Sequence, residues 1–563
     1  MKKIVLFTLS ACMTFLIACN SLDLNPLSTG SNANWYADES EVNMSLNDLY
    51  RDPFWPVDLE TWTDNWMARN ALTPITDATI NSQWATSETY YQTAYKAIGR
   101  ANTLLANIDK ASGNISQSNL DRYNAEARFV RASQYSLLIS HFGDVVYYAD
   151  IPDLATAYNF SRTDKKIILK SIYEDYDFAI SKLPLSYGSA DLKRATKGAA
   201  LALKARIALY MGDWAVARDA AKACMDLKVY KLYPDFSTLF IPSTKNSVEN
   251  VFAIPRSVTL GSYFVDGGLI TRNAGGNSGS NPSWDLFCSF LCKDGLTIDK
   301  SPLFDPRQPF KNRDPRCTAT LVEFQTKHLG FMYQPHPDSL TCYNFNTGKY
   351  QINNDSRSNT QYASFNGIIF KKGIDDSWLI SGNKVDPDKI IIRFADVMLI
   401  YAEAKIELNE VDQSVLDAIN QVRARAYNVD YKSSSAYPVV ATTNQSDLRK
   451  TIRIERRMEF ANEGIRYMDL IRWKLAEKVL NKPNYGMLDP TDLRIKVIKP
   501  GLWFFPQTPS IDEDGVADLT PMYNAGLIKL LAVRKFDITK QYLWPIPAKE
   551  LLINPNIKQN PGY

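Results

Sequence analysis

Residues 196–227, TKGAALALKARIALYMGDWAVARDAAKACMDL, decide the fold class of this chain. Two apolar runs with helical periodicity lie on either side of Met211-Gly212-Asp213. Alanine occupies many of the apolar positions, and its small side chain favours helix formation and lets two helices approach closely. The Gly-Asp turn is followed directly by Trp214. The segment therefore predicts a pair of helices joined by a short turn.

Similar amphipathic segments recur along most of the chain, at residues 86–109, 120–144, 391–410, 415–427 and 448–480. The second of these stops at Gly143-Asp144, and the last is long enough to predict one continuous helix. Helix pairs that bury their apolar faces by stacking on neighbouring pairs are typical of tetratricopeptide-like repeats. We therefore expect a mostly α fold, with a tetratricopeptide-like helix-pair scaffold.

The predicted helix at 448–480 carries a row of charged residues: Arg456, Arg457, Glu459, Glu463, Arg466, Asp469 and Arg472. Because both signs are interspersed, the row predicts ion pairs that join helices rather than a phosphate or DNA site. The whole chain has 64 Lys+Arg against 61 Asp+Glu, a formal net charge of +3. A protein with this charge has no strongly basic surface, so we expect no nucleic-acid partner.

Residues 231–389 differ from the helical segments because they are rich in Gly, Asn, Ser and Pro. Examples are TRNAGGNSGSNPSW at 271–284 and YNFNTGKYQINNDSRSNTQY at 343–362. A stretch of this length is too long for a connector. It predicts a long irregular loop insertion packed on the helical scaffold, where recognition surfaces usually lie.

The N-terminus predicts export and a lipid anchor. Residues 1–18, MKKIVLFTLSACMTFLIA, combine two lysines with an apolar run of signal-peptide length. The run ends in Leu16-Ile17-Ala18-Cys19, which resembles a bacterial lipobox with lipidation at Cys19; an ordinary secretory signal is the alternative. Residues 19–35 are polar and turn-rich, as in a flexible tether. No later stretch approaches about 18 uninterrupted apolar residues, so lipid would hold the body at the membrane.

The composition predicts one ordered body after the tether. At 45% hydrophobic and 22% charged residues, the 563-residue chain is neither disordered nor collagen-like. We expect a single domain at 36–563, with a helical part at 36–230, the insertion at 231–389 and a second helical part at 390–563. Five cysteines lie in this body without a CxxC pair, and Cys288 and Cys292 could pair or merely pack. With only 3 His, no metal or cofactor is expected.

Several motifs occur in one order along the chain: AYKAIGRAN (94–102), AEARFVRASQYSLLISHFGDV (125–145), NRDPR (312–316), IIRFADVMLIYAEA (391–404), ERRMEFANEGIRYMDLIRW (455–473) and LWPIPAKELLINPNIKQNPGY (543–563). Together with the lipobox they resemble the SusD-like (RagB/SusD) family, surface glycan-binding lipoproteins of Bacteroidetes. The resemblance implies one SusD-like domain on the outer membrane, facing the cell exterior, that binds oligosaccharide without catalysis. It also implies a TonB-dependent (SusC-like) transporter partner, which the protein would cover as a lid.

The residues themselves offer no enzyme motif: there is no HExxH, P-loop or Rossmann glycine pattern. A glycan needs less, because a sugar presents an apolar C–H face to aromatic rings and hydroxyls to Asp, Asn or Arg. The densest such cluster contains Trp62, Asp64, Asn65, Trp66 and Trp84. Binding and core packing are both open for its three tryptophans. If the cluster binds glycan, Trp62→Ala should lower affinity without lowering the melting temperature.

Three further candidates lie elsewhere: Trp284 in the insertion, Arg357 in a later polar loop, and Asn43 after the tether. The resemblance brings the loops of the insertion alongside the N-terminal aromatics. Core packing is favoured for each residue alone, and one or two contacts are expected from the group. A peptide-capturing or purely structural lid is the alternative function, gripping its ligand by backbone pairing and Arg. The 11 Trp favour sugar.

Overall fold

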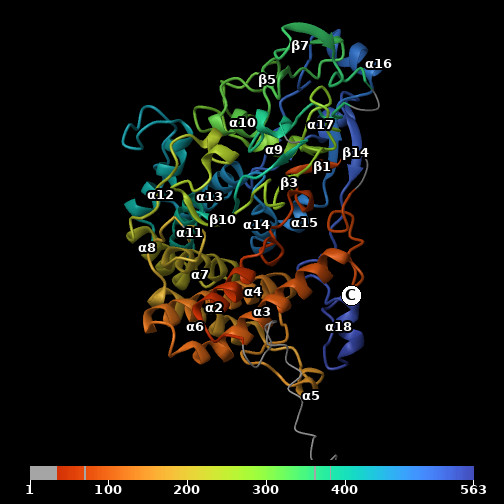
Figure 1. The fold of residues 1–563 in the computed structure, drawn as a ribbon. Helices are drawn as coiled ribbons and strands as arrows, with labels where there is room; N and C mark the ends of the chain where they lie inside the picture. Colours follow the sequence, from red (N-terminus) through yellow and green to blue (C-terminus); the bar gives the residue numbers. More distant parts are fainter. Residues whose placement is uncertain (1–34, 69–71, 190, 360–362, 381) are drawn as a thin grey trace, which may run out of the picture.

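The computed structural model describes residues 35–68, 72–189, 191–359, 363–380 and 382–563 (Figure 1). The predicted signal peptide, Cys19 and nearly all of the predicted tether lie outside these residues. The first half of the chain forms a layer of helices: α2 (Glu39–Leu49), α3 (Ala85–Asn107), α4 (Gln117–Phe142), α5 (Leu154–Ala157), α6 (Lys165–Lys182), α7 (Lys197–Met211) and α8 (Trp214–Asp226). From α3 to α8 the longer helices pack in chain order, each on the next, and α8 packs on α11 (Phe394–Glu407).

Local sequence explains where the helices begin and end. Ser116 caps the N-terminus of α4 by accepting from the Asn119 N–H, and Thr196 caps α7 in the same way. Gly143 and Gly212 end α4 and α7 with φ angles of 73° and 76°, which a glycine adopts without strain. The predicted helix pair at 196–227 is therefore confirmed, with its turn at Gly212.

A second group of helices covers α8: α11, α12 (Gln413–Ala426), α13 (Gln445–Phe460), α14 (Arg466–Arg472) and α15 (Ala476–Val479). The prediction of one continuous helix over 448–480 is wrong, because the chain turns between α13 and α14. Asn462 and Gly464 have φ angles of 61° and 72° in this turn. A Cβ on Gly464 would lie 2.4 Å from the Asp58 carbonyl oxygen, so the turn makes room for the N-terminal segment.

The charge row on α13 and α14 forms buried ion pairs with neighbouring helices, as predicted. Glu459 accepts from Arg393 at 2.7 Å and from Arg316 at 3.1 Å, and also pairs with Arg425. Burial would raise the pKa of Glu459, but the surrounding arginines lower it to about 2. A second network joins Arg456 to Asp396 at 2.8 Å and to Asp469 at 2.9 Å. These networks fix how the helices sit against one another.

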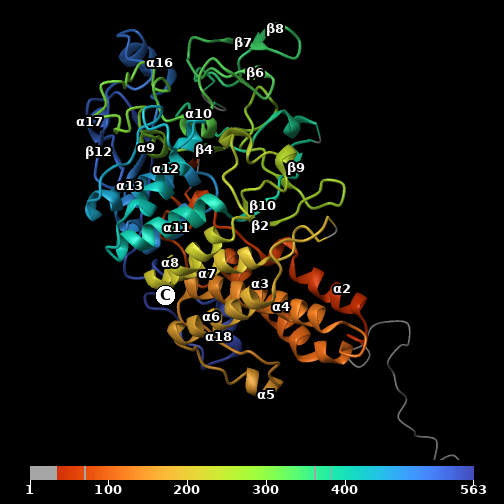
Figure 2. The same ribbon diagram turned by 90° about the vertical axis from the view of Figure 1, so that its left-hand side faces the viewer.

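The remaining segments form loops with short strands at the opposite end of the molecule from α3 and α6 (Figures 1 and 2). The strands are β1 (Trp66–Ala68), β2 (Asn250–Ile254), β3 (Phe264–Val265), β4 (Ser280–Pro282), β5 (Lys327–His328), β6 (Phe331–Met332), β7 (Thr341–Asn344), β8 (Lys349–Ile352), β9 (Lys384–Val385), β10 (Lys389–Arg393), β11 (Pro483–Gly486), β12 (Ser510–Ile511), β13 (Ala517–Asp518) and β14 (Lys529–Val533). Antiparallel pairs join β1 to β4, β2 to β10, β3 to β9, β11 to β14 and β12 to β13, and β5 to β8 form a sheet in chain order.

Short helices punctuate these loops and the C-terminus: α9 (Trp284–Ser289), α10 (Pro315–Thr320), α16 (Pro490–Leu493), α17 (Thr520–Asn524) and α18 (Ala548–Ile553). A π-helical turn at Arg494–Ile498 directly follows α16. Short 3-10 helices lie at Asp52–Phe54, Glu60–Trp62, Ile108–Ala111, Phe236–Thr238, Pro242–Thr244 and Asp376–Leu379.

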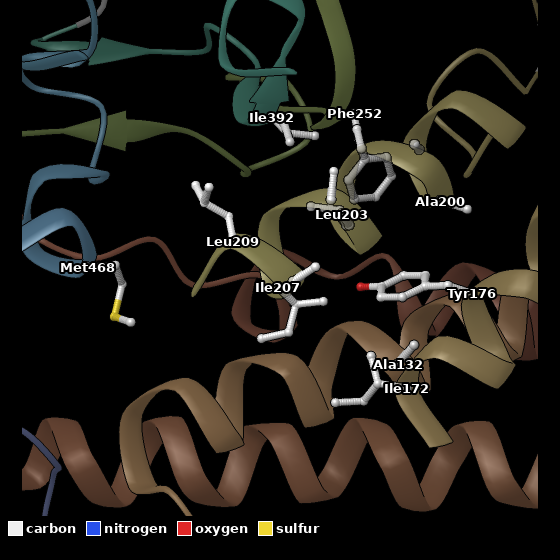
Figure 3. Packing of buried hydrophobic residues seen from close by; sticks show 14 of the residues in the cluster. Ala132, Ile172, Tyr176, Ala200, Leu203, Ile207, Leu209, Phe252, Ile392 and Met468 are labelled. Carbon is white, nitrogen blue, oxygen red and sulfur yellow. The ribbon is translucent and has the colours of Figure 1, made fainter. Parts of the chain in front are cut away.

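Two hydrophobic cores hold the body together. In the first, Leu203 and Ile207 of α7 lie between Ile172 of α6 and Phe252 of β2 (Figure 3). The second core joins the insertion to residues from α13 and from 485–528, and a small third cluster of Val322, Tyr333 and Ile369 lies within the insertion. Cys288 and Cys292 are buried free thiols in this second core, and they pack rather than pair.

The mostly helical fold with a long loop region is thus confirmed. Within the described ranges, no helix has the combination of length and apolar character needed to cross a membrane.

Candidate functional site

Trp62 lies inside the first core. Its side chain is 2% exposed, and its ring centroid lies 5.7 Å from Trp84, 5.2 Å from Trp544 and 5.7 Å from Tyr467. A ring enclosed on these sides offers no face to a sugar. Of the two alternatives for Trp62, its surroundings support core packing.

Asp64 and Asn65 are also buried, and they tie the N-terminal loop to α13 and α14. The Asp64 carboxylate lies 2.9 Å from both Arg457 and Arg466. Burial would raise the pKa of Asp64, but the two guanidinium groups hold it well below its usual range. Asn65 donates to Glu60 at 2.7 Å and accepts from Arg457 at 2.9 Å. In this geometry both side chains bind protein groups rather than a ligand.

The other three candidates outside the loops have structural contacts as well. Trp284 is buried in the second core, where its Nε1–H donates to the Asn366 carbonyl at 2.8 Å. Trp84 is half-buried at the start of α3, with its ring 4.8 Å from that of Trp544. Asn43 lies on α2, donates to the Tyr123 hydroxyl and accepts from Arg194 at 3.1 Å. These contacts fit the core-packing alternative for the three residues.

Two of the predicted residues, Trp66 and Arg357, lie in neighbouring loops. Trp66 of β1 pairs with Pro282 of β4, and the Pro282 carbonyl accepts from the Asn366 side chain at 2.6 Å. Phe365, the residue before Asn366, lies under the Arg357 guanidinium, whose Cζ is 5.1 Å from the centroid of the Phe365 ring. A chain of contacts therefore runs from Trp66 through Pro282 and the neighbouring residues Asn366 and Phe365 to Arg357.

Arg357 is the most unusual polar group in these loops. Its side chain is 2% exposed, yet only Nη2 makes a hydrogen bond, to Asp489 at 3.1 Å. Nε and Nη1 are buried and have no partner among the described residues. Burial lowers the pKa of Arg357, and Asp489 opposes this effect. Buried donors are normally satisfied, so these two nitrogens make Arg357 a candidate ligand contact.

The surroundings of Arg357 are held in place from both sides. Asp355, two residues earlier, accepts from the backbone N–H groups of Arg272 and Asn273 at 2.8 and 3.2 Å. Burial raises the pKa of Asp355 to about 6. On the other side, Asp489 pairs with Lys529 of β14 at 2.8 Å, and this ammonium lowers the pKa of Asp489. We call Trp66, Arg357, Phe365, Asp489 and Lys529 the loop face.

Unpartnered polar atoms also occur at β1 and β4. The Trp66 indole is half-buried and its Nε1–H has no partner among the described residues. On β4, both amide atoms of the buried Asn281 side chain lack a partner too. The sequence did not single out Asn281, Phe365, Asp489 or Lys529. Asp489 lies 132 positions after Arg357, so only the fold places its carboxylate beside the Arg357 guanidinium.

The side chains of the loop face are aromatic and polar. No group of three or more His, Cys, Asp or Glu side chains within the described ranges could hold a metal ion. The chemical resources are a half-buried indole, a planar guanidinium with free donors, and an exposed Asp489–Lys529 pair. Indole and guanidinium together suit a ring with one apolar face and neighbouring hydroxyls.

Comparison with known proteins gives the same family along the whole body. The model of the SusD family matches residues 241–563, and a model described as starch-binding associating with outer membrane matches residues 31–209. SusD-like protein P2 of Formosa agariphila is 23% identical, over 97% of this chain and 97% of its own.

Solved structures agree with the fold. A SusD-like carbohydrate-binding protein from Bacteroides fragilis superimposes with a TM-score of 0.75 at 27% identity, over 93% of this chain and 100% of its own. A laminarin-binding SusD-like protein has a TM-score of 0.60 at 20% identity, over 94% and 100% of the two chains, and shares the fold. Because the family model spans more than half of the sequence, we conclude that this chain belongs to the SusD family.

Proposed function

We propose that this protein is a cell-surface lipoprotein that binds an oligosaccharide at the loop face and delivers it to a TonB-dependent outer-membrane transporter. The observation that carries the binding site is the buried Arg357 guanidinium, whose Nε and Nη1 have no partner in the described part of the chain. A glycan hydroxyl, reached directly or through one ordered water, would accept from each of these nitrogens.

The apolar side of the same sugar chain would pack on Trp66. The indole is half-buried, so part of the ring is open to a ligand, and its free Nε1–H can donate to a hydroxyl or ring oxygen. Asp489 and Lys529 would form the polar rim of the site, because both side chains are exposed. Binding of this kind needs no reaction, and we propose that the protein is not an enzyme.

The place of the protein in the cell rests on the sequence and on the family. The lipobox at Cys19 supports lipidation and anchoring to the outer membrane. The description of the family model at residues 31–209 supports outer-membrane association and a carbohydrate ligand. A transporter partner follows from the family resemblance, in which the lipoprotein covers the transporter and passes glycan to it.

The binding site is tested by calorimetry of the protein without residues 1–19, against neutral hexasaccharides of several linkages, laminarihexaose among them. Arg357→Gln should weaken binding of the recognised glycan at least tenfold, since hydrogen bonds from a charged group contribute about 1.5 to 3 kcal/mol. Trp66→Leu should have a similar effect. Arg453→Gln is the matched control. Arg453 lies on α13, outside the loop face, and pairs with Asp514 at 2.8 Å.

Thermal unfolding of each variant, followed by circular dichroism, separates lost binding from lost folding. If Arg357→Gln and Trp66→Leu both bind the glycan as tightly as the unaltered protein, the loop face is not the binding site.

A further inference from the structure

A cleft of about 1050 Å³ opens on another part of the molecule. Four segments form its walls: the end of α2 with the turn at 50–53, Ser189 and residues 191–194 between α6 and α7, Asn246 before β2, and the end of β2 with the loop that follows it. In Figure 2, α2, β2 and the nearby β9 lie along the same side of the molecule. Small-molecule sites typically measure roughly 300–1000 Å³, so the cleft is large enough for several sugar rings. No residue of the loop face lines it.

Aromatic and apolar side chains lie at the mouth of the cleft. Tyr263 is 37% exposed and Leu260 is 85% exposed, although large apolar side chains usually avoid such exposure in folded domains. The Lys384 ammonium lies 4.9 Å from the Tyr263 ring centroid, which holds the ring in place through a cation–π contact. Tyr50, half-buried deeper in the cleft, donates to Glu126 at 2.7 Å.

The charged residues of the cleft are already neutralised within the protein. Each lining cation has a carboxylate partner: Arg51 with Asp48 at 3.2 Å, Lys193 with Asp388 at 2.5 Å and Arg194 with Glu126 at 3.1 Å. The lining carboxylates Asp52 and Asp191 pair with Lys389 at 2.8 Å and with Arg194 at 2.6 Å. Every cation that an acidic ligand would meet among the lining residues is therefore already paired with a carboxylate. The exposed amides of Asn47 and Asn246 provide uncharged hydrogen-bonding groups.

We propose that this cleft is a second ligand site, which takes a neutral oligosaccharide chain. Tyr263 stacks on the apolar face of one sugar ring, and the amides of Asn47 and Asn246 bind hydroxyls of the rings beside it. The proposal extends the proposed function to a second site. It stands on residues that the loop face does not use, so each site can succeed or fail alone.

Titration calorimetry of the protein without residues 1–19 tests the cleft with the same neutral hexasaccharides and with hexagalacturonate as the acidic probe. The unaltered protein should bind two molecules of a recognised neutral hexasaccharide. Tyr263→Ala should weaken one of the two sites at least tenfold, and Tyr263→Phe should retain both because it keeps the ring. Arg357→Gln should weaken only the other site. Tyr350→Ala is the control, since Tyr350 is 69% exposed on β8 and lies outside the cleft.

Hydrogen exchange gives a second readout that does not depend on the substitutions. Addition of the neutral hexasaccharide to the unaltered protein should slow exchange at residues 47–53 and 254–263. Binding unaffected by Tyr263→Ala, without protection of these segments, overturns the cleft and leaves the loop face standing.

The remaining outcomes are equally decisive. Loss of all binding in Tyr263→Ala, with no effect of Arg357→Gln, supports the cleft and overturns the loop face. Binding of hexagalacturonate that Tyr263→Ala abolishes overturns the assignment to neutral glycans. Failure of every neutral hexasaccharide to bind overturns both sites.

Discussion

Trp62 packs against four aromatic rings, those of Trp84, Tyr90, Tyr467 and Trp544. Two of these rings come from segments about 400 or more positions along the chain. From the sequence alone, Trp62 and Trp66 look alike, since both lie in a polar loop rich in aromatics. Their environments differ because Tyr467 and Trp544 cover Trp62, whereas Trp66 keeps part of its surface and an unpartnered indole N–H.

Trp62→Ala should therefore lower the free energy of unfolding by about 3 to 5 kcal/mol, as replacements of large buried aromatics by alanine do. Equilibrium unfolding in urea, followed by circular dichroism, measures this loss. Tyr350→Ala serves as the control and should change the free energy by less than about 0.5 kcal/mol, because its side chain is mostly exposed. Unchanged stability of Trp62→Ala together with weaker glycan binding would restore the interpretation of Trp62 as a ligand contact.

Arg357 illustrates the opposite outcome at the same scale. Its planar guanidinium made it a candidate from the sequence, but its special feature is visible only in the fold. On α13, the buried Arg456 pairs with both Asp396 and Asp469. Arg357 has a single partner, the exposed Asp489. Arg456 therefore joins helices, whereas Arg357 keeps two donors that no described residue uses.

At the scale of elements, local signals explain the helices that were predicted with accurate ends. Segments 86–109 and 120–144 became α3 and α4 because the periodicity and Gly143 lie within the segments, and the Ser116 cap lies just before the second one. The break between α13 and α14 was missed because its cause is distant. The Asp58 backbone packs closely against Gly464 at this turn. Asp64 pairs with one arginine from each helix, Arg457 of α13 and Arg466 of α14.

Two glycines of the helical layer make a matched pair for a stability test. Gly143→Ala should cost about 1 to 3 kcal/mol, because alanine is strained at φ 73° and its Cβ would lie 3.1 Å from the Leu543 side chain. Gly99→Ala should instead stabilise the protein by about 0.5 to 1 kcal/mol, since Gly99 lies inside α3 with nothing within 4 Å of an added Cβ.

Urea unfolding of the two glycine variants beside the unaltered protein gives both values. Equal effects in the two variants would contradict the assignment of Gly143 as a helix end that requires glycine.

At the scale of the whole molecule, α13 belongs to both hydrophobic cores. Ile452 and Phe460 pack in the first core, while Met458 packs in the second with Ala461 just beyond the helix. The buried Glu459 lies among these residues and joins arginines from three other segments. Loss of α13 from either core would leave buried charges without partners, which is costly. The helical layer and the loop region are therefore coupled.

This coupling predicts that the folded body unfolds in one cooperative transition. Differential scanning calorimetry of the protein without residues 1–19 should give a single peak, with the calorimetric enthalpy close to the van 't Hoff enthalpy. A loop region that melts separately, seen as two resolved peaks, would contradict it. Addition of a bound hexasaccharide should raise the midpoint of the same single peak, because the ligand binds only the folded state.

The sequence by itself determined the helix pairs, the ion-pair character of the charge row, the predicted lipid anchor and the family resemblance. Each of these depends on residues that are near one another in the chain or on motifs in a fixed order. Only the tertiary structure decided which aromatics are buried, where the predicted long helix turns, and which polar groups are left without partners. Burial and hydrogen-bond satisfaction depend on contacts between distant segments, as Trp544 with Trp62 and Asp489 with Arg357 demonstrate.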